Sequence, residues 1–343
     1  TLKVIRDDKQ FVVDRLKVKG VDASEILDKV IALDDSRKCV QGKVDALNAE
    51  LNNIAKEVGI LFKSGKKEEA EVLKNRNSTI KEEVRSLEEE MAASENELTK
   101  LLITLPNMPS VLVPEGRSDK DNVVVKDAYF EVKLPADALP HWELARKYDI
   151  IDWELGTKLA GAGFPVYKRM GARLQRALIA YFLDRNIGAG YDEMMPPIVA
   201  NEASGYGTGQ LPDKEGQMYH ATLDNLYLIP TAEVPVTNIY RDVVVEEKDL
   251  PIKMTAYTPC FRREAGSYGK DVRGLNRLHQ FDKVEIVQIV KPEGSYGVLD
   301  SMVAHVESIV KELELPYRIL RLCGGDISFT SALTYDFEVY SAA

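Results

Sequence analysis

Hydrophobic and polar positions repeat most regularly in the first third of the chain. Between residues 30 and 61 an apolar side chain recurs at alternating spacings of three and four, and only Arg37 interrupts the series. After a short polar break at 64–66 the same spacing resumes over 70–101. This repeat is typical of a coiled-coil seam. It predicts two long helices, each roughly 45–50 Å in length at 1.5 Å per residue.

The two series are mirror images about the break at 64–66. Folding the chain there sets apolar positions opposite each other, such as Leu51 and Ile80, and sets Arg37 opposite Ser94. A parallel dimer of separate helices would not require this symmetry. We therefore expect an intramolecular antiparallel hairpin with its tip near 64–66.

The rest of the chain mixes helical and strand patterns without a repeating βα period, which favours an α+β fold. We expect an N-terminal helical arm over 1–104, which begins with a short helix before Gly20. A proline- and polar-rich linker over 105–122 and a second domain over 123–343 follow. In the second domain, a helix from about Gly171 to Arg185 and a strand from Tyr191 to Val199, interrupted by two prolines, predict an edge strand. An amphipathic helix over 299–313 is expected to place His305 on its polar surface.

The segment 253–290 contains most of the candidate functional side chains. Two runs with strand character flank a loop, 265–277, in which glycines alternate with Lys and Arg. Because side chains alternate faces along a strand, the second run carries one polar face around an aromatic ring. The residues of that face are His279, Phe281, Lys283 and Glu285. A solvated face would show the same split, but a glycine-rich basic loop between such strands suits a phosphate or nucleic-acid backbone.

Composition and charge narrow the function. The net charge is −10, so no global basic field attracts DNA or RNA, and RNA contacts would need local basic patches. No apolar run is long enough to cross a membrane, and the first residues have no signal-peptide core. The three cysteines, Cys39, Cys260 and Cys323, are scattered, which fits free thiols in a reducing, cytoplasmic compartment. No spacing of Cys and His predicts a zinc site.

Two motifs resemble those of a known enzyme family. The stretch FRREAGSYGKDVRGLNRLHQFDKVE, from Phe261 to Glu285, is similar to motif 2 of class II aminoacyl-tRNA synthetases in its seryl form. The upstream Thr231-Ala232-Glu233 resembles the serine-binding loop of seryl-tRNA synthetases, and the likeness covers essentially the whole chain. It implies a class II catalytic domain with an antiparallel sheet flanked by helices. It also implies a serine–tRNA ligase that forms seryl-adenylate from ATP and loads tRNA(Ser), with tRNA(Sec) as a second candidate.

The resemblance assigns roles to individual residues. Arg262, Glu264 and Glu285 would be catalytic, and serine would be bound by Thr231, Ala232, Glu233 and Glu285. ATP, carrying Mg²⁺, would be bound by Arg262, Arg263, Glu264, Leu278 and Phe281. A hydroxyl and a carboxylate two residues apart could bind an ammonium. Thr231 could equally cap a helix over 234–241.

The resemblance also implies partners and a missing segment. The helical arm would hold tRNA, with Lys63, Lys66 and Lys67 as contacts at its tip, and the basic loop would add Lys270, Arg273 and Arg277. Pro197 would lie in motif 1, the homodimer contact. The family's motif 3 and its main metal ligands are expected beyond Ala343. A chain that stops there would be incomplete for activity.

Two alternatives remain open at the level of sequence. The first is a synthetase paralogue that loads a carrier protein, but such relatives lack the long arm and use zinc. The second is a catalytically inactive, dimeric RNA-binding or scaffold protein that keeps the fold. Serine-dependent exchange of pyrophosphate with ATP would separate the enzyme from the scaffold.

Overall fold

The structure is a computed structural model that describes residues 1–127, 134–213, 216–264 and 273–342. The chain forms two compact units. Unit 1 consists of Thr1–Val123 and Arg321–Thr334, and unit 2 consists of Val124–Leu320 and Tyr335–Ala343. The helices of unit 1 are α1 (Leu2–Asp7), α2 (Lys9–Val18), α3 (Ser24–Lys63), α4 (Lys67–Leu102) and the 3-10 helix η1 (Asp119–Asp121).

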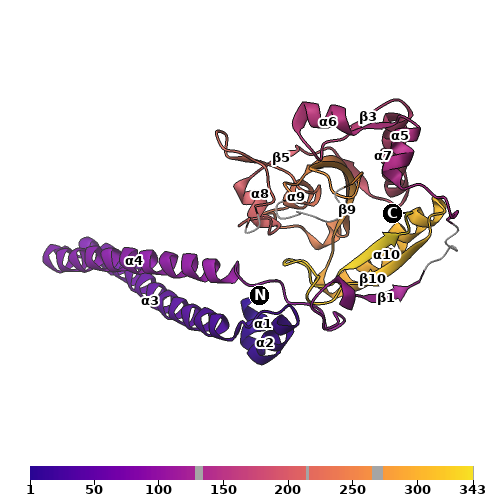
Figure 1. Cartoon of the computed structure of the whole chain (residues 1–343). Coiled ribbons are helices and arrows are strands. Elements are labelled where there is room, and N and C mark those ends of the chain that lie inside the picture. The colour runs from indigo at the N-terminus through magenta and orange to yellow at the C-terminus, as the bar shows by residue number, and fades with distance from the viewer. Residues whose placement is uncertain (128–133, 214–215, 265–272, 343) are drawn as a thin grey trace. The chain divides into compact units, whose positions relative to one another are not determined.

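The helices α3 and α4 form the predicted antiparallel hairpin (Figure 1). Its turn lies between Lys63 and Lys67, where the sequence predicts the tip. The expected partners share one apolar cluster along the seam. That cluster contains Val40, Val44, Ile54, Ile80 and Val84, with Leu47, Leu51, Val58, Leu73, Leu87 and Met91 packed against it. The three-four repeat therefore determines both the helices and their pairing.

The base of the hairpin is closed by α1 and α2. Their apolar side chains form a second cluster with the lower end of the seam, made of Ile5, Val12, Val13, Leu16, Ala23, Leu27, Val30 and Leu98. The prediction of one short helix before Gly20 is wrong, because the chain breaks at Asp8. The Asp8 carboxylate accepts a hydrogen bond from the Phe11 N–H (2.9 Å), so this residue ends α1 and caps α2.

A charged residue is buried in the lower seam. Asp34 is 1% exposed and forms ion pairs with Arg6 (2.8 Å), Lys38 (2.8 Å) and Arg37 (3.0 Å). Hydrogen bonds from Lys38 and then Arg37 outweigh the effect of burial and lower the Asp34 pKa. Arg37, expected opposite Ser94, pairs instead with Asp34 and with Glu95 at 3.9 Å. An inward-facing carboxylate explains why the seam tolerates an arginine.

Residues 105–122, expected to form a linker, are hydrogen-bonded to the second segment of unit 1. The N–H groups of Asn107 and Ser110 donate to the carbonyls of Phe329 (2.9 Å) and Ala332 (2.8 Å). The ammonium of Lys19 donates to the carbonyls of three residues of the same segment, Ser328, Phe329 and Ser331. Burial lowers the Lys19 pKa to about 8.

Unit 2 combines short sheets with helices, as the α+β prediction requires. The helices are α5 (His141–Lys147), α6 (Trp153–Ala160), α7 (Met170–Gly188), α8 (Glu202–Gly207), α9 (Glu233–Asn238), α10 (Ser295–Glu312) and the 3-10 helices η2 (Glu247–Asp249) and η3 (Pro292–Gly294). The strands are β1 (Val123–Lys126), β2 (Ile151–Asp152), β3 (Val166–Tyr167), β4 (Asp192–Met194), β5 (Val199–Asn201), β6 (His220–Ala221), β7 (Leu226–Leu228), β8 (Ile252–Phe261), β9 (Gln280–Ile289), β10 (Tyr317–Arg321) and β11 (Tyr335–Val339). They form sheets in the orders β1-β10-β11, β2-β3, β4-β8-β9 and β5-β7-β6.

The strands β8 and β9 form the long antiparallel hairpin on which the expected site is built. Their register pairs Cys260 with Phe281 and Ala256 with Glu285. The strand β4 lies parallel to β8 at the sheet edge, as the proline rule predicts. The prediction of a single strand over 191–199 is wrong, since the prolines separate β4 from β5, which joins another sheet.

Candidate active site

The loop before α9 lies against the end of β8. The Phe261 N–H donates to the carbonyl of Ile229 (2.8 Å), and Arg262 Nε donates to the carbonyl of Pro230 (3.3 Å). These contacts bring Thr231 over the charged face of β9. Thr231 is not the N-cap, which is Ala232, although its Oγ1 accepts a weak bond from the Glu233 N–H (3.4 Å).

Three polar side chains converge at this point. The Thr231 hydroxyl donates to Glu285 Oε2 (3.0 Å), as expected of two residues that share a ligand. Lys283 Nζ lies 2.7 Å from the same Oε2 and donates to Thr231 Oγ1 (2.9 Å). The expected serine residues Thr231 and Glu285 are thus adjacent, and Lys283 joins them.

Glu233 begins α9 beside this group. Loss of hydration is the main cause that raises its pKa, the negative charge of Glu285 adds to the effect, and Lys283 opposes it. Glu233 is nevertheless exposed to solvent as a residue. The ammonium of Lys283 is paired with Glu285, and the pKa of Glu233 is raised beside that pair. Perturbed carboxylates in such a setting are characteristic of ligand sites.

Arg262 and Phe281 lie at the other end of the same face. The guanidinium of Arg262 is 5.1 Å from the centre of the Phe281 ring, close enough for a cation–π contact. The Arg262 N–H donates to the carbonyl of His279 (3.0 Å), which fixes the backbone while the side chain remains exposed. A planar guanidinium in this position can hold two oxygens of a phosphate at once.

Glu264 and Arg277 form an ion pair of 3.0 Å at the start and end of the basic loop. The backbone of Glu264 has a positive φ of 50°. Residues other than glycine seldom adopt this conformation, and it occurs often at functional sites. Arg273 stacks over the ring of Trp142 at 4.8 Å, and Lys270 lies outside the described residues. Arg263 is exposed and donates its N–H to Gln217 (2.8 Å).

Two expected contact residues have buried side chains. Ala232 is fully buried in a cluster with Met254 and Ala256, and Leu278 is also buried. The side chains of Ala232 and Leu278 are therefore not accessible to a ligand in this structure. The remaining candidates lie away from this site in sequence. Lys66 pairs with Glu69 (2.9 Å) at the hairpin tip, beside Lys63 and Lys67, and Pro197 is exposed between β4 and β5.

Sequence reasoning placed Lys283 on the polar face but gave it no role, and it missed a buried polar chain behind the site. Asn186, on α7, accepts a hydrogen bond at Oδ1 from His305 Nε2 (2.8 Å), and its Nδ2 donates to Thr255 Oγ1 (2.9 Å). Thr255 in turn donates to the backbone carbonyl of Glu285 (2.8 Å). His305 is therefore half-buried, and its expected position on a polar surface is wrong. Helical spacing alone could not reveal this, since the partner comes from another helix.

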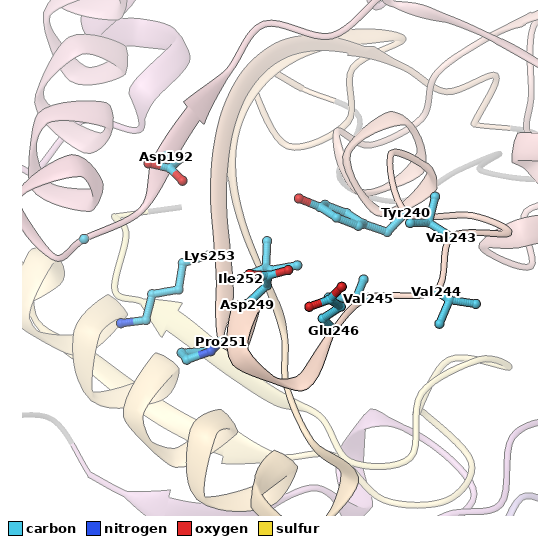
Figure 2. Close-up of a pocket in the computed structure, with 11 residues that line it drawn as sticks. Asp192, Tyr240, Val243, Val244, Val245, Glu246, Asp249, Pro251, Ile252 and Lys253 are labelled. Carbon is cyan, nitrogen blue, oxygen red and sulfur yellow. The ribbon is translucent and has the colours of Figure 1, made fainter.

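A pocket of about 730 Å³ opens elsewhere in unit 2 (Figure 2). Its described lining includes Asp192 on β4, Glu246, Asp249 and Lys253, and none of the residues expected to bind serine or ATP. Asp192 and Lys253 place this pocket beside the starts of β4 and β8. Over the ranges that the structure describes, no group of three or more His, Cys, Asp or Glu side chains could hold a metal ion, and no helix is long and apolar enough to cross a membrane.

Comparison with known proteins gives independent information. Residues 1–109 match the family model for the seryl-tRNA synthetase N-terminal domain, and 219–343 match the class II tRNA synthetase core domain (G, H, P, S and T). The serine–tRNA ligase of Salinibacter ruber is 45% identical over 342 residues, which are 100% of this chain and 80% of the relative. The chain belongs to the serine–tRNA ligase family.

Other relatives agree. The serine–tRNA ligase of a Synechocystis species is 45% identical and aligns with 99% of this chain and 80% of its own length. A crystal structure of seryl-tRNA synthetase from Pyrococcus horikoshii in complex with ATP superimposes with a TM-score of 0.87 at 29% identity, covering 99% of this chain and 80% of that one. The fold expected from the seryl-tRNA synthetase motifs is confirmed.

Proposed function

We propose that this serine–tRNA ligase family member activates serine with ATP and transfers the seryl group to the 3′ end of tRNA(Ser). The observation that carries the proposal is the cluster of Thr231, Lys283 and Glu285, with Glu233 beside it. It offers a hydroxyl and two carboxylates to a small ligand that has an ammonium and a hydroxyl. The ATP complex of the Pyrococcus horikoshii relative supports ATP as the second substrate.

The first step joins serine to the nucleotide. A serine carboxylate oxygen attacks the α-phosphorus of ATP, an O–P bond forms, and the bond to pyrophosphate breaks. We assign the α-phosphate to Arg262, the adenine to the ring of Phe281, and the adenine edge to Glu264. We assign the serine ammonium to Glu233, Glu285 and Thr231. Little covalent chemistry is required of the protein, so positioning and charge stabilisation carry the rate.

Magnesium would enter with ATP as part of the substrate. Glu264 is paired with Arg277, and no group of three or more His, Cys, Asp or Glu side chains among the described residues could hold a metal ion. We therefore assign no step of the reaction to a metal bound by these residues.

The second step would use the hairpin. We propose that the α3–α4 arm binds tRNA and that Lys63, Lys66 and Lys67 at its tip contact the phosphate backbone. Arg273 and Arg277, at the end of the basic loop, would lie near the acceptor end. Basic residues at the tip offset a chain that is acidic as a whole, which would confine the RNA contact to that part of the arm.

We propose that the protein is a cytoplasmic homodimer whose interface includes α7, β4 and Pro197. Only Gly171 and Asn186 are buried among the 19 residues of α7, and Met195 after β4 is 93% exposed. Apolar surface of this kind indicates a partner. The three unpaired cysteines fit a reducing compartment.

Sedimentation should give a dimer, and Met195→Asp should dissociate it. A monomeric wild-type protein would contradict the proposal.

Serine-dependent exchange of pyrophosphate with ATP tests the activity. We expect exchange with serine and a far lower rate with alanine, on the order of 10⁴-fold, because a site that bonds a hydroxyl leaves polar groups unpaired when the hydroxyl is absent. Charging of tRNA(Ser) and tRNA(Sec) would follow. A full-length protein that binds tRNA but shows no exchange would favour an inactive RNA-binding scaffold.

A further inference from the structure

Lys283 occupies the position that the proposed function gives to the substrate ammonium. Its Nζ lies 2.7 Å from Glu285 Oε2 and 2.9 Å from Thr231 Oγ1. An amino-acid ammonium bound by Thr231 and Glu285 would need the same two oxygens. Two ammonium groups repel each other at such a distance. Serine must therefore displace the lysine tip, or bind more weakly beside it.

The charge of the site leaves room for one further cation. Glu233 and Glu285 carry two negative charges, and Lys283 supplies one positive charge. Loss of hydration and then Glu285 raise the Glu233 pKa. The ammonium of serine would balance the remaining negative charge of the three side chains, and the serine carboxylate would bring one further negative charge toward the α-phosphate. The lysine is thus retained in a site that would otherwise offer two uncompensated carboxylates to solvent.

The register of β9 suggests where the displaced ammonium goes. Phe281, Lys283 and Glu285 share one face, and alternate residues of a strand are about 6.6 Å apart. With adenine on Phe281 and the serine amino group at Glu285, the serine carboxylate and the α-phosphate lie between them. The stem of Lys283 begins beneath that junction, and its side chain is 35% exposed, so the long flexible stem has space to turn.

Lys283 and Arg262 act on the same region of the sheet. Across the sheet Lys283 pairs with Thr258 and Phe281 pairs with Cys260, and the Arg262 guanidinium lies 5.1 Å from the centre of the Phe281 ring. Lys283 and Arg262 are therefore both neighbours of Phe281 on this face. A turned Lys283 would reach the reacting atoms from the strand beneath them.

We propose that Lys283 is a catalytic residue that mimics the substrate ammonium in the empty site and moves to the carboxylate–α-phosphate junction when serine binds. This proposal rests on the proposed function. The lysine keeps its proton throughout and stabilises the charge that develops as the O–P bond forms and pyrophosphate leaves. Its competition weakens serine binding in the ground state, and its charge favours the transition state, which is the differential binding that raises kcat.

The variant Lys283→Met tests the proposal, because methionine keeps an unbranched chain and removes the charge. In the full-length protein we expect serine to bind several-fold more tightly by calorimetry without ATP. We expect kcat for serine-dependent pyrophosphate exchange to fall about 100-fold, as after loss of one transition-state contact. A fall in both KM and kcat is the signature of a removed ground-state competitor. Lys283→Arg, which keeps the charge, should recover part of kcat.

Two results would overturn the proposal. Weaker serine binding with lower kcat would mean that Lys283 only holds Glu285 in place, and an unchanged kcat would mean that the lysine takes no part in the reaction. The matched control is Lys253→Met on β8, whose ammonium lies over the ring of Tyr191 (5.5 Å). It should change neither quantity. Absence of exchange by the wild-type protein would instead refute the proposed function, and serine binding would remain measurable.

Discussion

Two regions of the molecule shift the pKa of a carboxyl group in opposite directions. In the hairpin seam, Asp34 faces three cations, and its pKa is lowered chiefly by the hydrogen bond from Lys38. On the β8–β9 sheet, Glu285 pairs with Lys283 (2.7 Å), and loss of hydration, followed by the charge of Glu285, raises the pKa of the nearby Glu233. Asp34 thus has three cationic partners, whereas Lys283 is the one cation paired with Glu285 in the described contacts of the second region.

The difference separates charge that serves the fold from charge that serves a ligand. A buried carboxylate with a full set of partners contributes to one fixed packing of helices. A carboxylate with too few cationic partners destabilises the ligand-free protein, and it contributes to binding when a cationic ligand arrives. If this distinction is correct, substitutions in the hairpin seam should change stability with little effect on catalysis. Substitutions on the sheet should do the opposite.

The largest expected effect is on the sheet. Arg262→Ala should lower serine-dependent pyrophosphate exchange by about 10³-fold or more, because it removes the group assigned to the α-phosphate. The free energy of unfolding should change by less than about 1 kcal/mol, since the contacts of this exposed side chain with the described residues are a bond of 3.3 Å to the Pro230 carbonyl and the Phe281 ring. Exchange kinetics and urea unfolding measure the two quantities.

The control for this variant is Arg85→Ala, because Arg85 is an exposed arginine on the hairpin. This variant should change neither the rate of pyrophosphate exchange nor the free energy of unfolding. A large loss of stability in Arg262→Ala would mean that this arginine belongs to the fold.

Shortening the hairpin should affect only the second step. Replacing residues 40–91 by a short glycine-serine turn removes the upper seam and the tip, and it keeps Asp34, Leu27 and Leu98 at the base. We expect exchange to persist and tRNA charging to fall by about two orders of magnitude, because several phosphate contacts are lost. If exchange disappeared as well, the division of roles between the two regions would be wrong.

Asp34→Asn should weaken the lower hairpin by about 1–3 kcal/mol, because charge-assisted hydrogen bonds are lost and the cations that remain are only partly exposed. The wild-type contribution should be complete above the ordinary pKa of 3.8 and should disappear as the pH falls through the lowered pKa of the folded state. Denaturant unfolding followed by circular dichroism, with exchange measured in parallel, provides the test.

Asp35→Asn is the matched control, because Asp35 is 56% exposed and pairs only with Arg6 in the described contacts. It should cost less than about 1 kcal/mol. Equal losses in the two variants would show that burial of Asp34 adds nothing.

The smallest expected effect is the pH dependence of serine binding. A raised Glu233 pKa means that the carboxyl loses its proton above its ordinary value of 4.5, and the bound ammonium favours the charged form. Serine affinity should therefore rise with pH through that range, by less than about tenfold. Calorimetry should show a flat profile for Glu233→Gln. A rise that persists in this variant would assign the titration to another group.

The sequence by itself determined the hairpin almost completely. A three-four repeat specifies both helices and, through its mirror symmetry, the pairing of Leu51 with Ile80. One short turn joins the two helices, so the distance of a residue from that turn determines its partner on the other helix. It also placed Arg262 and Glu285 in motif 2, where the resemblance to seryl-tRNA synthetases supplied their roles. The break at Asp8 and the inward position of Asp34 were not visible in that repeat.

Only the tertiary structure decided how the charges meet. Thr231 reaches Glu285 because the loop before α9 is hydrogen-bonded to the end of β8, and that contact joins residues more than 50 positions apart. The sequence identified Lys283 as one polar residue on a strand face. Its bonds to Thr231 and Glu285 depend on the pairing of β8 with β9 and on the position of that loop. Alternation along a strand shows in the sequence which face a side chain lies on. Its contacts with segments far away in the sequence are set only by the tertiary structure.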